Sequence, residues 1–341
     1  MVEELITMRP DLEILGVAGE RLNRAGITAI ANVDELSVMG LFEVIGSLGR
    51  IRNVMKRLVA ELERGVDLLV VVDFSGFNIR LARAAKALGI PVVFYVSPQV
   101  WAWRHKRAAE ISILAKEVLC LLPFEPDVYK EAGGNASFVG HPLATTATTC
   151  ADSEGHWLLL PGSREAEISR LLPAMVAVAD ELRTRDESAK FKIGAAPGWS
   201  AERLSRVANV DLTNIEVVES LESGASGAKA ALVSSGTATL QLGFMTVPMV
   251  VIYKVNPFTH WLLRRIVKGV EMIALPNIVL KRQVVPEFIQ RLPTLELANA
   301  LEFAALGGQV PALSELRKVM ASDNPSRVAA NKVESWLPTM D

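Results

Sequence analysis

The chain has 341 residues, with 36 Lys or Arg against 38 Asp or Glu and a formal net charge of -2. This length is too great for one ordinary hydrophobic core and fits two domains of roughly 150 residues each. The near-neutral balance lacks the overall positive charge typical of proteins that bind nucleic acids, so we predict no nucleic-acid partner. Hydrophobic residues make up 50% of the chain, yet no apolar run approaches the roughly 18 residues of a membrane-spanning helix.

The number and spacing of the cysteines and histidines bear on whether the chain holds disulfides or a metal site. Cys120 and Cys150 are the only cysteines, and the 4 histidines are scattered without metal-ligand spacing. This usage supports neither a disulfide framework nor a structural zinc site, and we predict no metal and no cofactor. The first residues lack the charged and then apolar pattern of a secretory signal, so we expect a cytoplasmic protein.

Short apolar runs alternate with longer segments of helical periodicity along the chain. This alternation is typical of an α/β fold with parallel sheets, here in two Rossmann-like halves. Residues 143–155 have no apolar period and lie between the two series of strands, so we expect a linker there. The predicted strands are residues 14–17, 68–72, 92–96, 157–160, 191–195, 215–218, 230–233 and 249–253.

We therefore predict an N-terminal domain at 1–148 and a C-terminal domain at 155–318. Residues 319–341 are expected to form a C-terminal helix that packs back on the N-terminal domain.

The segment VVDFSGFN, residues 71–78, places Asp73 at the end of a buried strand. Ser75 and Gly76 fall in the predicted turn, and a helix is predicted from near Ile79. Ligands of open α/β sheets bind outside the carboxyl ends of the strands, where a carboxylate can act as a general base on a hydroxyl. The same pattern also fits an Asp that caps the helix or forms the turn.

The segment PGSREAEI, residues 161–168, follows the first predicted strand of the second half. Ser163 is the predicted N-cap of a helix, with Glu165 and Glu167 in its first turn. The amides and dipole of such a helix start favour an anion, and Arg164 would add charge-assisted hydrogen bonds to it. A solvated surface Arg fits the pattern equally well.

The segment SSGTATLQLG, residues 234–243, repeats this arrangement after another predicted strand. Ser235, Gly236 and Thr237 offer small side chains and hydroxyl groups, so the backbone can approach a phosphate closely. An ordinary helix start accounts for the same residues. Further on, Asn277 and Glu287 are polar residues in an apolar context, and spacing alone gives them no role.

Residues 39–58 form the strongest candidate for contact with a membrane surface. Apolar residues recur near helical spacing, with basic residues among them, as in helices that lie in the bilayer interface. An amphipathic helix packed on its own domain gives the same stripe, and Gly46 and Gly49 argue against one continuous helix. The apolar residues are Phe42, Ile45, Leu48, Ile51 and Met55, and the basic ones include Arg50, Arg52, Lys56 and Arg57.

A second basic and aromatic segment spans residues 95–107. Trp101 and Trp103 stand beside Arg104, a mixture that can anchor at a lipid interface or contact a phosphate. Core tryptophans next to a solvated helix start fit it as well.

Six short motifs follow one another along the chain: VSPQVWAWR (96–104), LLPFEPDVY (121–129), FVGHPL (138–143), LLPGSR (159–164), SGTATL (235–240) and LPNI (275–278). Any one of them is a weak signal, but six in order with compatible spacing are specific. Together they resemble the lipid-A-disaccharide synthase family. The VWAWR and LPFE strings argue against other sugar-nucleotide enzymes of similar fold, such as a glycolipid N-acetylglucosaminyltransferase or a nucleotide-sugar epimerase.

The resemblance implies a GT-B fold, in which two Rossmann-like domains with parallel sheets face a central cleft. It implies a metal-independent, inverting glycosyltransferase of Gram-negative lipid A (lipopolysaccharide) biosynthesis. The donor would be UDP-2,3-diacylglucosamine and the acceptor 2,3-diacylglucosamine 1-phosphate, giving lipid A disaccharide 1-phosphate and UDP. The enzyme would lie peripherally on the inner face of the inner membrane, and the resemblance suggests a homodimer.

The resemblance also assigns roles to residues. Asp73 matches an acidic residue of the segment that activates the acceptor hydroxyl, so it is the expected catalytic base. The expected residues for the donor and its UDP group are Ser163, Arg164, Ser235, Gly236, Thr237, Gln241, Asn277 and Glu287. Those expected at the membrane or acceptor are Phe42, Ile45, Leu48, Arg50, Trp103 and Arg104.

The chain departs from the family pattern at three places. Family members usually begin with a strand and a glycine-rich GEASGD-like loop, and we expect this chain to start after that loop, in the first helix. Gly76 stands where a second acid is often found, and Gln241 stands where an acid is common. These departures motivate a second hypothesis, a catalytically impaired, membrane-associated protein that binds a UDP-sugar or lipid.

Overall fold

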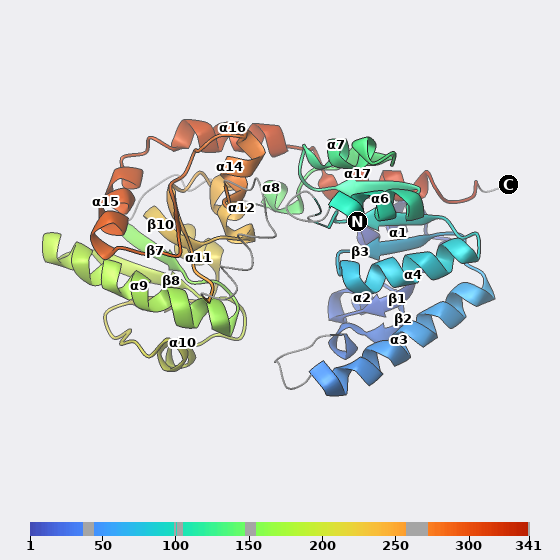
Figure 1. Ribbon diagram of the computed structural model, residues 1–341, viewed down its shortest axis with the longest axis horizontal. Helices are drawn as coiled ribbons and strands as arrows, with labels where there is room; N and C mark the ends of the chain where they lie inside the picture. The colour runs from blue at the N-terminus through green and yellow to red at the C-terminus, as the bar shows by residue number, and fades with distance from the viewer. Residues whose placement is uncertain (37–43, 99, 101–104, 147–154, 257–271, 340–341) are drawn as a thin grey trace. The chain divides into compact units, whose positions relative to one another are not determined.

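The computed structural model describes residues 1–36, 44–98, 100, 105–146, 155–256 and 272–339 (Figure 1). It divides into two compact units, unit 1 with Met1–Pro142 and Ser322–Asp341, and unit 2 with Leu143–Ala321. Strands and helices alternate in both units, and every strand pair in the described residues is parallel. The predicted α/β class is therefore confirmed.

Unit 1 contains a four-stranded sheet in the order β3-β4-β5-β6 and a separate two-stranded sheet, β1-β2. Its strands are β1 (Leu15–Ala18), β2 (Thr28–Asn32), β3 (Leu69–Val72), β4 (Val92–Tyr95), β5 (Glu117–Cys120) and β6 (Ala136–Phe138). Its helices are α1 (Val2–Met8), α2 (Glu20–Arg24), the short η1 (Val33–Glu35), α3 (Val44–Arg64), α4 (Ser75–Ala87), α6 (His105–Leu114), α7 (Glu125–Glu131) and α17 (Pro325–Glu334).

Helices cover both faces of the four-stranded sheet. In β4, Val92 and Phe94 face the core shared with α3, α4, α6 and α7, whereas Val93 and Tyr95 face the core shared with α1 and α17. This alternation buries all four residues of β4, as expected for a parallel strand with helices on both sides. The sheet therefore presents its functional groups only at the strand ends and their loops.

The C-terminal helix α17 is fixed to unit 1 by a buried carboxylate. Glu117 in β5 is 3% exposed and accepts hydrogen bonds from Ser137 Oγ at 2.5 Å and Trp336 Nε1 at 2.8 Å. Lys332 Nζ lies 3.1 Å from the same carboxylate. Burial alone raises the pKa of Glu117, but these three partners outweigh it and leave the pKa below its usual value.

Unit 2 contains a six-stranded parallel sheet in the order β12-β11-β10-β7-β8-β9. Its strands are β7 (His156–Leu160), β8 (Lys190–Gly194), β9 (Glu216–Val218), β10 (Ala228–Ser234), β11 (Met249–Tyr253) and β12 (Glu287–Ile289). Its helices are α9 (Glu165–Arg185), α10 (Ala201–Ala208), α11 (Leu221–Ala225), α12 (Thr237–Phe244), α14 (Leu275–Leu280), α15 (Thr294–Ala305) and α16 (Val310–Met320). The short helix α8 (Pro142–Thr146) lies where the two units join in sequence.

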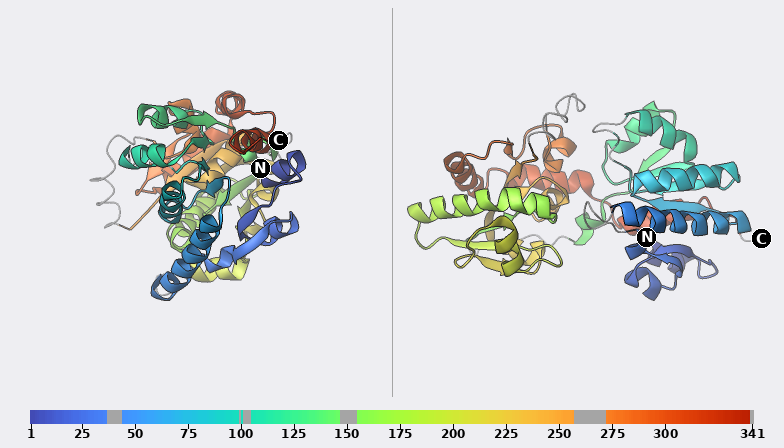
Figure 2. Two further views of the ribbon diagram at one scale, coloured as in Figure 1. Left: turned by 90° about the vertical axis from the view of Figure 1, so that its right-hand side faces the viewer. Right: turned by 60° about the horizontal axis from the view of Figure 1, so that its bottom comes forward.

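The two faces of this sheet are covered by different helices. Helices α9, α10 and α15 share a core with alternate residues of β7, β8 and β10; α9 is the long light-green helix in Figure 1 and in the right-hand view of Figure 2. The other face packs against α11, α12 and α16. The loops at the carboxyl ends of the strands are where an α/β sheet binds its ligands.

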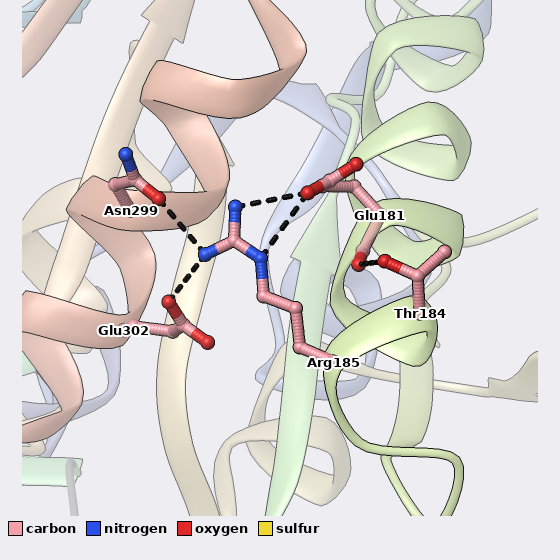
Figure 3. Close-up of polar contacts among 5 residues, drawn as sticks. All are labelled: Glu181, Thr184, Arg185, Asn299 and Glu302. Atoms are coloured by element: carbon pink, nitrogen blue, oxygen red, sulfur yellow. Dashed lines mark hydrogen bonds and ion pairs between the residues drawn. The ribbon is translucent and has the colours of Figure 1, made fainter.

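A polar cluster joins α9 to α15 on the first of these faces (Figure 3). Arg185 donates through Nη1 to Asn299 Oδ1 at 2.8 Å and to Glu302 Oε2 at 2.6 Å. On its own helix the same guanidinium donates to Glu181, through Nε at 3.1 Å and Nη2 at 2.9 Å. One side chain thereby fixes the two helices at the surface, above the apolar contacts between them.

Several local predictions are corrected by the structure. The helix after Asp73 begins at Ser75 and not near Ile79. Helix α3 runs without interruption through Gly46 and Gly49, because its buried residues Val54, Leu58 and Leu62 fix it against the sheet. The predicted linker at 143–155 begins with the helical residues of α8, and its residues 147–154 lie outside the described part.

Candidate functional site

The sheet of unit 2 contains a point where the strand order reverses. From β7 the chain proceeds to β8 and then β9, and it returns to form β10 on the other side of β7. In open α/β sheets such a reversal separates the loops that follow two neighbouring strands and creates a crevice for a ligand. The loops concerned are the two sequence candidates, 161–164 after β7 and 235–236 after β10.

The loop after β7 is narrow and is built around Gly162. This residue has φ +103°, a conformation that favours glycine, and a Cβ there would lie 3.2 Å from Ser234 Oγ. The same Cβ would lie 2.5 Å from Glu167 Oε2, so this loop packs closely against the first turn of α9 and the end of β10. The N-cap of α9 is Arg164, in extended conformation, one residue later than the predicted Ser163, and Glu165 and Glu167 occupy the first turn as predicted.

Arg164 lies at the open end of this loop. Its side chain is 80% exposed and forms an ion pair with Glu167, Nη1 to Oε1, at 2.7 Å. The charges of Arg164 and Glu167 both affect the pKa of Tyr253, at the end of β11. Burial raises the pKa of Tyr253, Glu167 raises it further, and Arg164 lowers it. A cationic side chain thus stands at the start of α9, in the loop that follows β7.

The loop after β10 exposes its backbone. Gly236 has φ +155°, a conformation open only to glycine, and a Cβ placed there would meet nothing within 4 Å. Ser235 Oγ donates to the Ile273 carbonyl at 2.9 Å, and Thr239 Oγ1 donates to the Gly236 carbonyl at 2.8 Å. Thr237, the first residue of α12, is exposed. The loop therefore offers amides and a hydroxyl to a ligand without steric obstruction.

Gln241 and Glu222 meet near this loop. The Gln241 side-chain amide donates to the Glu222 carboxylate across α12 and α11. Glu222 is in the first turn of α11, so the pair places a carboxylate beside Gln241.

Asn277 and the half-buried Glu287 form a hydrogen-bonded pair. Asn277 is fully buried, and its amide donates to Glu287 Oε1 at 2.7 Å and to the Val285 carbonyl at 2.9 Å. Glu287 also accepts from the amides of Ile273 and Ala274, each at 2.9 Å. Ser235 donates to the carbonyl of Ile273, and Glu287 holds the amide of the same residue. The Asn277–Glu287 pair therefore fixes the chain segment that contacts the loop after β10.

In unit 1, Asp73 occupies a strained turn at the carboxyl end of β3. Asp73 and Phe74 have φ of +46° and +37°, which costs non-glycine residues on the order of 1–3 kcal/mol each. The side-chain amide of the buried Asn78 donates to the carbonyls of Val72 and Asp73, at 3.0 and 2.8 Å. The Asp73 side chain is exposed, so the turn presents this carboxylate to solvent.

Val96, at the end of the neighbouring strand β4, is also left-handed, with φ +64°. It leads to Ser97, whose hydroxyl lies 3.0 Å from the Tyr129 hydroxyl in a buried pair. Strain at the ends of two adjacent strands is typical of functional sites. Gly76, in the first turn of α4, has nothing within 4 Å of a Cβ, so the turn leaves room beside Asp73.

The membrane and acceptor candidates are only partly described. Phe42, Trp103 and Arg104 lie outside the described residues, and the side chains of Ile45 and Leu48 do as well. Arg50 is exposed on α3. The C-terminal part of the same apolar stripe, Ile51 and Met55, packs on the core of unit 1, as expected for an amphipathic helix on its own domain.

The described residues contain neither a cluster of metal-binding side chains nor a membrane-spanning helix. No group of three or more His, Cys, Asp or Glu side chains there is arranged to hold a metal ion. No helix in this part of the chain is long and apolar enough to cross a membrane.

Two solved structures illustrate the fold that this chain shares with other proteins. MurG of Acinetobacter baumannii matches with a TM-score of 0.55 at 15% identity, over 98% of this chain and 94% of that one. The UDP-GlcNAc 2-epimerase of Methanocaldococcus jannaschii, solved in complex with UDP-GlcNAc and UDP, matches with a TM-score of 0.58 at 12% identity, over 98% and 96%. These likenesses show the GT-B fold.

Sequence relatives are much closer. Lipid-A-disaccharide synthase of Anaeromyxobacter dehalogenans is 39% identical over 96% of this chain and 91% of its own length. The Myxococcus xanthus protein of the same name is 37% identical over 99% and 93%. A family model described as Lipid-A-disaccharide synthetase matches residues 1–327. The chain therefore belongs to the lipid-A-disaccharide synthase family, the glycosyltransferases of lipid A biosynthesis that its six motifs resemble.

Proposed function

We propose that this glycosyltransferase transfers 2,3-diacylglucosamine from UDP to 2,3-diacylglucosamine 1-phosphate, giving lipid A disaccharide 1-phosphate and UDP. The observation that carries the proposal is the reversal of strand order in unit 2. Its two flanking loops combine exposed amides, a hydroxyl and the guanidinium of Arg164, the groups that bind a diphosphate.

The donor side follows from the charge that develops during transfer. As the glycosidic bond to UDP breaks, negative charge grows on the leaving diphosphate, and fixed dipoles and cations stabilise it. The start of α9 with Arg164, and the loop of Ser235, Gly236 and Thr237, supply such groups. Ser163 and Gln241 complete the donor side, while Asn277 and Glu287 act by holding the segment behind it.

The acceptor side requires removal of a proton from a hydroxyl group as it attacks the sugar. Asp73 is the proposed general base, because its carboxylate is exposed in a turn that is held in a strained conformation by Asn78. With the hydroxyl as nucleophile and UDP as leaving group in a single displacement, the configuration at the sugar carbon is inverted. In this proposal, neither the removal of the proton nor the departure of UDP requires a metal ion.

Because both substrates carry acyl chains that reside in a bilayer, the enzyme is proposed to lie on the inner face of the inner membrane. Phe42, Ile45 and Leu48 are the proposed apolar contacts, with Arg50, Trp103 and Arg104 near the headgroups. Replacing the first three together with Ser is expected to reduce binding to vesicles that contain anionic lipid. Unchanged vesicle binding would remove these residues from the proposal. A homodimer is proposed on the family resemblance alone.

The experiment for the catalytic proposal measures UDP release from UDP-2,3-diacylglucosamine in the presence of the acceptor lipid. Asp73→Asn is expected to lower kcat by about 10²- to 10⁴-fold, the usual contribution of a general base. Asp67→Asn is the matched control, because Asp67 is exposed and precedes the amino end of the same strand, β3. Equal kcat values for both variants would show that Asp73 is not the base.

A further inference from the structure

A tryptophan outside every sequence motif connects the loop after β7 to the loop after β8. Trp199 lies between β8 and α10, and its indole Nε1 donates to the main-chain oxygen of Ser163 at 3.1 Å. The two residues are 36 positions apart in sequence. Since β7 and β8 are hydrogen-bonded neighbours, the bond ties together loops at the same edge of the sheet.

The indole ring is itself held in place. The guanidinium of Arg203 lies 4.0 Å from the Trp199 ring centroid, a distance at which the cation is attracted to the face of the ring. Arg203 Nη1 also donates to the Gly198 carbonyl at 2.9 Å, which fixes the cation to the same loop. The ring packs partly buried against the core of unit 2. Trp199 is therefore a rigid support and not a mobile surface side chain.

We propose that Trp199 is a positioning residue for the donor diphosphate, acting through the peptide group between Ser163 and Arg164. The Ser163 carbonyl and the Arg164 amide belong to one planar, trans peptide unit. A hydrogen bond that fixes the direction of the carbonyl therefore also fixes the direction of the amide at the start of α9. An anion at a helix start depends on that direction. This inference rests on the proposed donor site in unit 2.

The test is the affinity of the full-length protein for UDP, measured by isothermal titration calorimetry. Trp199→Phe keeps an aromatic ring under Arg203 but replaces the indole with a smaller ring that has no N–H donor. Loss of one hydrogen bond is worth roughly a three- to tenfold change in an equilibrium constant, so the Kd for UDP is expected to rise by about that factor. In turnover, the donor KM is expected to rise similarly, while kcat and the acceptor KM stay unchanged.

Trp157→Phe is the matched control. Trp157 is a buried core residue of the same unit, on β7, so its replacement lowers folding stability without touching the Ser163 carbonyl. The expected result is weaker UDP binding for Trp199→Phe and unchanged binding for Trp157→Phe, with both variants folded by circular dichroism. Equal UDP affinity of the wild type and Trp199→Phe would overturn the positioning role. A folded wild-type protein that binds no UDP would instead overturn the proposed donor site.

Discussion

At the scale of single residues, the proposed site residues lie at the carboxyl ends of strands, and the sequence indicates only some of them. Arg164 and Ser235 follow apolar strands and could be named as candidates from that position, which an ordinary helix start fits equally well. Trp199 could not, because its contact with Ser163 depends on the packing of two loops 36 residues apart. The strained turn at Asp73 was also hidden, since Asp73 and Phe74 are left-handed without being glycine.

Arg164 gives the first prediction at this scale. Hydrogen bonds to a charged group are worth about 1.5–3 kcal/mol, so Arg164→Ala is expected to weaken UDP binding by roughly ten- to a hundredfold. The thermal unfolding temperature is expected to stay the same, because the ion pair with Glu167 is exposed. Arg206→Ala, at another exposed position in unit 2, serves as the control. A similar loss of affinity in both variants would mean that only overall charge matters.

Glu117 gives a prediction for the dependence of stability on pH. Its folded-state pKa is lowered because the hydrogen bonds from Ser137, Trp336 and Lys332 outweigh the effect of burial. The ionised Glu117 therefore contributes to the free energy of unfolding above the unfolded carboxyl pKa of about 4.3. This contribution is lost as the pH falls through the folded-state pKa.

Glu117→Gln is accordingly expected to lower the free energy of unfolding by about 1–3 kcal/mol at pH 7. The difference from wild type is expected to shrink below about pH 4. Urea unfolding at both pH values measures it. A difference that is the same at both would show that the charge of Glu117 contributes nothing.

At the scale of elements, apolar runs predicted most of the described strands and missed β2, β5, β6 and β12. The predicted 249–253 coincides with β11, and the predicted 92–96 differs from β4 by one residue. In contrast, β6 has three residues, and β5 begins with the buried Glu117. Such strands are specified by their neighbours in the sheet and by long-range hydrogen bonds, which leave no periodic pattern in the sequence.

Helix α3 shows the converse, an element that local propensity argues against and packing forms. Gly49 is exposed within this helix, and a Cβ there would meet nothing within 4 Å. Gly49→Ala is therefore expected to raise the free energy of unfolding by about 0.5–1 kcal/mol, as measured by urea denaturation. Gly134→Ala is the contrasting variant, because its Cβ would lie 2.7 Å from the Cβ of Ser112. A lower free energy of unfolding for Gly49→Ala would contradict this expectation and would mean that the added methyl group clashes with a neighbour.

At the scale of the whole molecule, each unit has its own sheet and its own core, and unit 1 is assembled from both ends of the chain. Ala329, Ala330 and Val333 of α17 complete the core on one face of its sheet, and Glu117 fixes the helix there. The division of labour proposed above follows this organisation, with the donor groups on unit 2 and the base on unit 1. Parallel sheets and the positions of the loops after β7 and β10 could be inferred from sequence; which side chains support those loops could not.

The most direct test of the proposed reaction is detection of its product. The purified protein would be incubated with UDP-2,3-diacylglucosamine and 2,3-diacylglucosamine 1-phosphate in the presence of EDTA, and the lipids analysed by mass spectrometry. We predict lipid A disaccharide 1-phosphate, formed only when both lipids are present and accompanied by an equal amount of UDP. A folded protein that binds UDP and yet forms no disaccharide would contradict the proposed transfer and identify a binding protein instead.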